Sequence, residues 1–315
     1  MTVPKSLFCL IPLPALVLGL LLIRPTTIHA ADDGARFATP EGAVLALLAA
    51  ASNQDTNALR ILFGAAVAEV ENPDRVQAAN DLAEFSRLSS ETNRIIHLSD
   101  SRSLLVVGHD DWPFAIPLTL KDGQWFFDTE AGAQELLNRR IGKNELLTLD
   151  TVRAYVAAQR DYALNDRDGD GVLEFAERLR SRPGMKDGLY WAPDLDGEIS
   201  PLGPLVAEAQ GEGYTMSVRD EQAQPVPFHG YFFKILTRQG SSAPGGAYNY
   251  RINGHMIGGF ALVAWPAEYG ESGIMTFIVN QQGRVYQKDL GPRTEKVVRR
   301  MKAYDPDQSW SVSHD

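Results

Sequence analysis

The chain has 315 residues, a net charge of −10 and a single cysteine, Cys9. The acidic balance disfavours nucleic acid and anionic membrane surfaces as partners, because both are themselves negative. One cysteine excludes an internal disulfide, and after Cys9 the chain offers neither a thiol nucleophile nor a thiolate metal ligand. The length suits one or two domains.

Residues 1–30 are typical of an export signal. Lys5 precedes an apolar run over residues 7–22, and Ala30 ends a small-residue cleavage site. We expect this signal peptide to be removed, which takes the net charge from −10 to −12, and the protein to be periplasmic or extracellular. A retained membrane anchor is the alternative, since a span needs roughly 20 apolar residues. No later segment is apolar enough to span a bilayer.

Residues 37–141 favour helices packed on a curved antiparallel sheet. Thr39 caps a helix that starts at Pro40 and runs to about residue 50. Further helices are predicted over 58–63, 74–88 and 129–140, and strands over 104–107, 114–120 and 124–128. This order resembles the SnoaL-like or nuclear-transport-factor-like cone, an α+β fold that hosts enzymes and binding modules alike.

Residues 144–181 read as a long amphipathic helix, 144–165, that leads into a calcium loop of the EF-hand type. The loop is Asp-Arg-Asp-Gly-Asp-Gly-Val-Leu-Glu-Phe-Ala-Glu over residues 166–177. Its pattern places oxygen ligands at positions one, three, five, seven, nine and twelve, with Gly171 at the sharp turn. The expected ligands are Asp166, Asp168, Asp170, the carbonyl of Val172, Glu174 and a bidentate Glu177.

The residues after the loop predict a lone, structural Ca²⁺ site. Only a short exit helix is expected over 175–180, before Pro183-Gly184, and no second loop follows to make an EF-hand pair. Without a cation, five carboxylates in twelve residues would repel one another. An empty acidic turn is the alternative.

Residues 182–310 predict a second antiparallel sheet. An irregular stretch over 182–228 holds a short helix at 202–208, and a strand follows at 231–237. Two hairpins are expected. The first joins strands 248–252 and 256–265 through Asn253-Gly254, and the second joins 273–279 to 284–287.

Three other groups of residues could carry chemistry, and each has an ordinary interpretation that we favour. His109, Asp110 and Asp111 could form an acid–base or metal group, or a polar turn. His229, His255 and Glu268 are zinc-ligand types, but their spacing matches no known motif. An aromatic set could make a glycan- or peptide-binding face, or belong to the core. That set is Tyr190, Trp191, Tyr231, Phe232, Phe233, Tyr248, Tyr250 and Trp265.

Several stretches together resemble a bacterial exported family known as domain of unknown function 2950. They are Asp110–Phe114, Leu137–Gly142, Asp166–Glu174, Gly188–Trp191, Pro201–Leu205, Phe228–Tyr231, Gly258–Gly270 and Met275–Asn280. The resemblance implies export to the cell envelope and carries no activity. The family's loop often lacks an acid at the place of Glu177. Residues 228–290 also resemble, more faintly, the C-terminal sheets of type IV pilin-like proteins.

Three functions remain open from the sequence. The leading hypothesis is a non-catalytic, calcium-stabilised binding or assembly module with an envelope protein or glycan as its partner. The second is an envelope hydrolase that uses a pocket in the N-terminal cone or the region of His229. The third is a pilus- or secretion-associated subunit.

Overall fold

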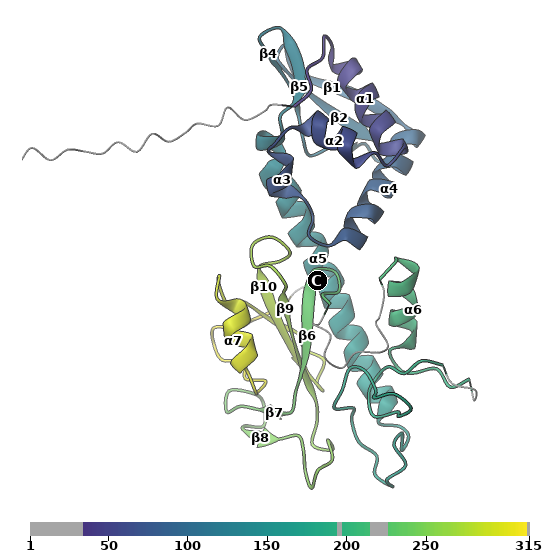
Figure 1. Cartoon of the computed structure of the whole chain (residues 1–315). Coiled ribbons are helices and arrows are strands. Elements are labelled where there is room, and N and C mark those ends of the chain that lie inside the picture. Colours follow the sequence, from purple (N-terminus) through teal and green to yellow (C-terminus); the bar gives the residue numbers. More distant parts are fainter. Residues whose placement is uncertain (1–33, 194–196, 215–225, 314–315) are drawn as a thin grey trace, which may run out of the picture. The chain divides into compact units, whose positions relative to one another are not determined.

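The computed structural model describes residues 34–193, 197–214 and 226–313 (Figure 1). The expected signal peptide, residues 1–30, lies outside this part of the chain. Within the described ranges, no helix combines the length and the hydropathy that crossing a membrane requires. The fold is α+β with antiparallel sheets, as the sequence predicts.

Four helices come first. They are α1 (Pro40–Ser52), α2 (Thr56–Phe63), α3 (Val67–Val70) and α4 (Arg75–Glu91). The Thr39 hydroxyl accepts from the Gly42 amide at 3.2 Å, as expected of the first cap. Asp55 and Asp74 cap α2 and α4 in the same manner, each accepting two backbone amides. Side-chain caps therefore fix where three of these helices begin.

The N-terminal sheet consists of β1 (Asn93–Ser99), β2 (Arg102–Val107), β3 (Trp112–Pro113), β4 (Leu118–Lys121) and β5 (Gln124–Phe127). Its order is β1-β2-β4-β5, with β3 paired to β2. Strand β1 was not predicted, because most of its residues are exposed and show no alternation. The interior is packed with side chains, including the rings of Phe63, Phe114 and Phe127, whose centroids lie 5.4–6.0 Å apart.

Helix α5 (Thr129–Tyr162) is continuous through residues 141–143, where the sequence predicted a break. That prediction was wrong because Gly142 costs a helix only about 1 kcal/mol and tertiary contacts hold the residues beside it. Buried Asn144 accepts from Gln77 Nε2 at 2.7 Å and donates to the Ser272 carbonyl at 2.8 Å.

The remaining elements build the C-terminal part. They are α6 (Gly203–Gly211), β6 (Tyr231–Leu236), β7 (Arg238–Gln239), β8 (Tyr248–Asn249), β9 (Ala261–Pro266), β10 (Met275–Asn280), β11 (Tyr286–Asp289), α7 (Thr294–Arg300) and β12 (Ser311–Val312). The larger sheet has the order β12-β11-β10-β9-β6, and β7 pairs separately with β8. In Figure 1, α7 lies on one side of this sheet and the second half of α5 on the other.

One predicted hairpin is confirmed and the other is wrong. Strands β10 and β11 pair as expected through the turn at 281–283. Asn253-Gly254 does form a tight turn, in which Ile252 and His255 exchange backbone hydrogen bonds of 2.8 and 3.0 Å. The chain then continues irregularly to β9, which pairs with β6 and β10 rather than with β8. Long-range pairing thus overrides the local turn signal.

Candidate calcium site

The acidic loop begins four residues after α5 ends at Tyr162. Asp166, Asp168 and Asp170 are exposed, and each places a carboxylate oxygen within 4.8 Å of the others. The structure therefore brings together the three aspartates that the spacing singled out.

The backbone of the loop is folded around the first aspartate. Asp166 accepts the amides of Gly169 and Gly171 at 2.8 and 2.9 Å. Both glycines have positive φ, 79° and 88°, a region that most side chains disfavour. The Gly171 amide is the main reason that the pKa of Asp166 lies below its usual value. The turn thus orients this carboxylate and keeps it ionised.

Glu174, further along the loop, meets Asp170 rather than the whole aspartate cluster. His255 Nδ1 lies 3.1 Å from Asp170 Oδ2 and 3.5 Å from Glu174 Oε2, so these three residues form a second cluster. The Met256 amide donates to Glu174 at 2.8 Å, while burial raises the pKa of this carboxyl. A cation beside Glu174 would stabilise its charged form.

Glu177 belongs to neither cluster. Arg251 holds it with two hydrogen bonds, one from Nε to Oε1 at 2.6 Å and one from Nη2 to Oε2. Its role as the bidentate ligand stays a prediction, and that role requires the ion pair with Arg251 to open. The Val172 amide donates to Asp170 at 2.8 Å, and ligation by the Val172 carbonyl likewise stays a prediction.

The predicted exit helix over residues 175–180 is absent, which corrects the sequence interpretation. Tertiary partners take the backbone groups that a helix would pair internally. The Phe175 amide donates to the Met256 carbonyl at 2.9 Å. The buried Gln159 accepts the Ala176 amide at 2.9 Å and donates to the Ala176 carbonyl at 2.8 Å. The loop exit is therefore anchored to α5 and to the turn that carries His255.

Arg167, the second loop residue, ties the loop to residues 186–198. Its guanidinium contacts Glu198 and lies 5.7 Å from the centre of the Trp191 ring, and its side chain is only 8% exposed. Lys186 donates to the other Glu198 oxygen at 2.5 Å. These contacts orient the backbone between Asp166 and Asp168.

Among the described residues, neither His109–Asp111 nor the set His229, His255 and Glu268 forms a metal-ligand cluster. His109–Asp111 is a turn, and Asp111 pairs with Arg94 at 2.6 Å. His229 lies 3.4 Å from Glu212, and the described residues bring neither it nor Glu268 into a cluster with His255. Much of the aromatic set is core, since Tyr190, Trp191, Tyr231 and Tyr250 are buried.

Sequence reasoning missed Gln159 and Arg251, which shape this site, and it considered His255 only in a zinc group with His229 and Glu268. Each sits at a distance along the chain that no loop motif specifies. Only the turn signal at Asn253-Gly254 marks their region, and it does not say that the turn meets the loop. Their placement depends on how α5 packs against the C-terminal sheet.

The donor set fits a hard divalent cation. The three aspartates and Glu174 offer only oxygen, and the Asp166 carboxylate is already oriented by backbone amides. Oxygen-rich sites of this kind select Ca²⁺ or Mg²⁺, and Ca²⁺ tolerates the irregular geometry of a flexible loop better. His255 adds a nitrogen at one side, which Ca²⁺ does not require.

The family model described as "Protein of unknown function (DUF2950)" matches residues 35–312. Neither the curated proteins nor the solved structures contain a match to the chain. The resemblances to SnoaL-like cones and to pilin-like sheets are therefore not confirmed.

Proposed function

The chain belongs to the DUF2950 family, and we propose that it is an exported bacterial envelope protein that acts as a calcium-stabilised binding or assembly module. The observation that carries this proposal is the cluster of Asp166, Asp168 and Asp170, whose carboxylate oxygens lie within 4.8 Å of one another. The proposal contains no catalytic step.

The calcium ion has a structural role in this proposal. Asp170 and Glu174 meet His255, and the Met256 amide binds Glu174, so the cation site adjoins a turn 78 or more residues further along the chain. A cation that binds Asp166, Asp168, Asp170 and Glu174 would hold the end of α5 against that turn. It would stabilise the folded state by about 3 kcal/mol at one hundred times its dissociation constant.

Export is supported by the sequence of residues 1–30, with Lys5 before the apolar run and a small-residue step at Ala30. Expression of the full chain in a bacterium, followed by N-terminal sequencing of the protein from the envelope fraction, tests this point. A mature start at Ala31 supports export. An intact chain in the cytoplasm contradicts it.

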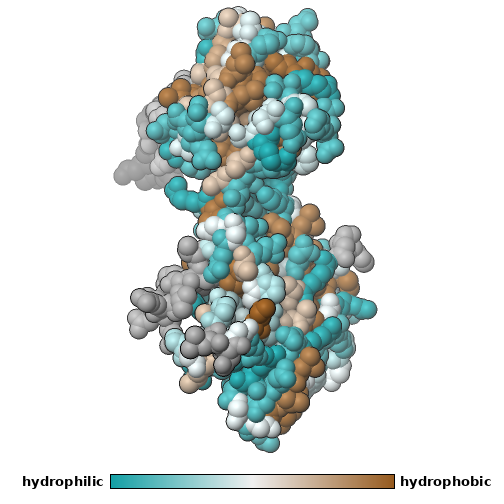
Figure 2. Space-filling model, turned by 90° about the vertical axis from the view of Figure 1, so that its right-hand side faces the viewer, coloured by the Kyte–Doolittle hydropathy of each residue, from teal (hydrophilic) through white to brown (hydrophobic). Residues whose placement is uncertain are grey.

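A binding role is supported by apolar residues on the surface. Figure 2 shows hydrophobic residues that reach the surface in several patches between hydrophilic ones on the face in view. Leu45 on α1 and Ile61 on α2 are 68% and 69% exposed. Contiguous apolar surface is a feature of interaction sites. The proposed partner is an envelope protein or a glycan.

The test compares two variants that each remove one exposed carboxylate. Asp168→Ala removes a proposed ligand, and Asp110→Ala removes an acid from the turn after β2. We expect added calcium to raise the melting temperature of the wild type and of Asp110→Ala, and to have little effect on Asp168→Ala. An equal calcium response in all three proteins would contradict the proposed site.

A hydrolase remains the second candidate because one polar cluster favours it. His229 is buried beside Glu212, and the Tyr214 hydroxyl, in edge contact with His229, donates to Asp74 at 2.7 Å. A buried histidine next to a carboxylate is a general-base arrangement. The test measures hydrolysis of peptidoglycan or of an ester by the wild type and by His229→Asn. Activity in the wild type that is lost in the variant would favour a hydrolase over a binding module.

A further inference from the structure

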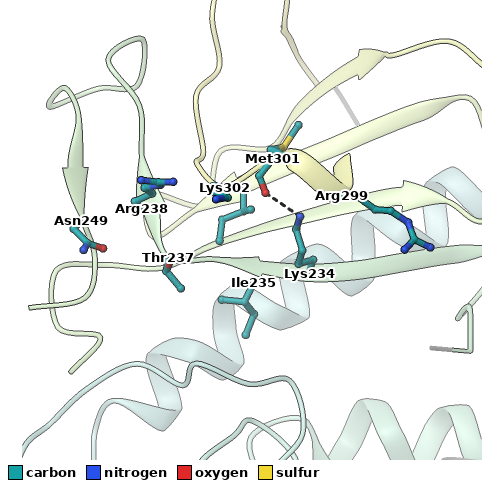
Figure 3. A pocket seen from close by; sticks show the side chains of 9 residues that line it. Lys234, Ile235, Thr237, Arg238, Asn249, Arg299, Met301 and Lys302 are labelled. Carbon is teal, nitrogen blue, oxygen red and sulfur yellow. Dashed lines mark hydrogen bonds between the residues drawn. The ribbon is translucent and has the colours of Figure 1, made fainter. Parts of the chain in front are cut away.

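A cavity of about 350 Å³ opens on the α7 side of the C-terminal sheet (Figure 3). Its wall comes from the end of β6, from β7 and β8, and from the residues where α7 ends. The polar side chains that line it are Lys234, Thr237, Arg238, Asn249, Arg299 and Lys302. Four of these are cationic and none is acidic, although the whole chain has a net charge of −10.

Lys234 lies at the inner end of this group. Its ammonium donates to the carbonyls of Val298 and Met301 at 2.5 and 2.9 Å, which leaves one of its three protons for another acceptor. The two carbonyls belong to the C-terminal end of α7, so Lys234 offsets their partial negative charge. Burial lowers the pKa of this lysine, because little water reaches the charge.

The other cations are partly or wholly unpaired. Arg299 donates to Glu295 through Nε and Nη2 at 3.0 and 2.6 Å, so its Nη1 is not used in this pair. Within the described part of the chain, the side chains of Arg238 and Lys302 take part in no hydrogen bond or ion pair. Figure 3 shows Arg238 and Lys302 on one side of Lys234 and Arg299 on the other, with the Arg299 guanidinium pointing away from the other three.

We propose that this cavity binds the phosphate group of a small organic phosphate. Cations that line one hollow without a carboxylate repel one another, and a dianion between them removes that repulsion. The free guanidinium fork of Arg238 suits a phosphate, and the ammonium groups of Lys234 and Lys302 add point charges. A carboxylate ligand would bring only one negative charge to these cations, so a phosphate dianion suits the cavity better.

The size of the cavity limits the rest of the ligand. A volume of about 350 Å³ is near the lower end for small-molecule pockets, roughly 300–1,000 Å³, so it holds a phosphate with one small attached group. A sugar phosphate and the headgroup of an anionic lipid share this chemistry. The site is independent of the calcium loop, and the proposal does not rest on calcium binding.

The experiment measures binding to the chain without residues 1–30 by titration calorimetry. The soluble probe is glucose 6-phosphate, with glucose and glucuronate as the neutral and carboxylate comparisons. The membrane probe is a phosphatidylcholine vesicle with or without phosphatidic acid, measured by co-sedimentation. The test variant is Arg238→Gln/Lys302→Gln. Its matched control, Lys296→Gln/Arg300→Gln, removes the same charge from exposed residues of α7 that do not line the cavity.

We expect glucose 6-phosphate or the phosphatidic acid vesicle to bind wild type and control alike, and the probe that binds identifies the source of the phosphate. Binding should weaken about tenfold or more in the test variant, since hydrogen bonds between charged groups are stronger than neutral ones. It should also weaken with added salt. Binding of neither probe to the wild type, equal binding to test and control variants, or glucuronate binding as tight as that of the phosphate would each overturn the proposal. Matching circular dichroism spectra establish that both variants are folded.

Discussion

Arg251 holds Glu177, the residue that the loop motif assigns to the cation as its last ligand. In the structure the guanidinium holds both carboxylate oxygens of Glu177, and Glu177 belongs to neither the Asp166-Asp168-Asp170 cluster nor the Asp170-Glu174-His255 cluster. A bidentate glutamate at the end of the loop normally completes the calcium shell. The calcium affinity of this site is therefore expected to be reduced by the free energy needed to separate Glu177 from Arg251.

Replacement of this arginine tests the competition. In Arg251→Met, Glu177 is free to ligate, and we expect calcium affinity to rise by about 1.4- to 5-fold, since an exposed ion pair contributes about 0.2–1 kcal/mol. The double variant Arg251→Met/Glu177→Gln should lose the gain, because the freed ligand is gone. Calorimetric titration with calcium compares the wild type, Arg251→Met, Glu177→Gln and the double variant. This double-mutant cycle separates the effect of the Arg251–Glu177 ion pair on calcium affinity from a general effect of charge.

A gain that persists in the double variant would show that Arg251 acts only through its positive charge. No gain in Arg251→Met would show that Glu177 does not ligate. Either result would remove Glu177 from the ligand set and leave Asp166, Asp168, Asp170 and Glu174 as the side-chain ligands.

His229 gives stability a pH dependence that is separate from the calcium loop. Burial lowers the pKa of this ring below its usual value, and Asp74 only partly opposes the shift, so the folded protein holds it neutral. In the unfolded chain the ring binds a proton below about pH 6.5. The unfolded state then holds more protons, so stability is greatest above that pH and falls as the pH drops towards the folded pKa.

His229→Asn should remove this part of the acid sensitivity. Asparagine tolerates the positive φ of 48° at this position, so the backbone can stay as it is. Urea unfolding in EDTA at pH 7.5, 6.5 and 5.5 measures the slope, to which one histidine contributes at most about 1.4 kcal/mol per pH unit. An identical slope in wild type and variant would contradict a buried, neutral His229. Glu212, Asp74 and Lys143 are the charged groups near this ring and remain in both proteins.

At the scale of elements, helix α5 connects the N-terminal and C-terminal sheets and contains Gly142, a position where the surrounding structure does not require a glycine. A Cβ at Gly142 would meet nothing within 4 Å. A Cβ at Gly132, in the same helix, would lie 2.8 Å from the Ile116 Cα and 2.9 Å from the Ala115 carbonyl oxygen. The two glycines therefore have different reasons to be in this helix.

Alanine substitutions should separate these two positions. We expect Gly142→Ala to stabilise the protein by about 0.5–1 kcal/mol, because alanine costs less backbone entropy in a helix. Gly132→Ala should destabilise it by about 1–3 kcal/mol through overpacking against Ile116. Chemical unfolding measures both. A destabilising Gly142→Ala would mean that α5 is broken near residue 142, as the sequence alone had indicated.

Some local signals in the sequence are sufficient to predict a helix or strand, and others are not. Thr39-Pro40 and Asp74 mark helix starts through local chemistry, and both helices begin where expected. The predictions of a helix over 175–180 and of a strand over 256–260 are wrong. In both segments, residues distant in the sequence form hydrogen bonds with the backbone. Gln159 and Met256 are such partners in the first case, and nothing near residue 175 in the sequence points to them. Helix α7 was also missed, since its seven residues lack a capping side chain.

At the scale of the whole molecule, the fold class and the three aspartates could be predicted, while the surroundings of the site could not. The spacing of Asp166, Asp168 and Asp170 defines a cluster within twelve residues, and the structure forms it. His255 and Arg251 reach the loop only because the sheet packs against α5. A motif fixes residues that are near in sequence, and tertiary packing decides which distant residues join them.

The central claim is that the folded chain binds one calcium ion at the loop and is stabilised by it. The most direct measurement is calorimetric titration of the metal-free protein that starts at Ala31, with melting curves of the same samples. We expect one ion per chain and a melting temperature that rises with calcium concentration. Absence of binding heat up to millimolar calcium, with an unchanged melting temperature, would contradict it.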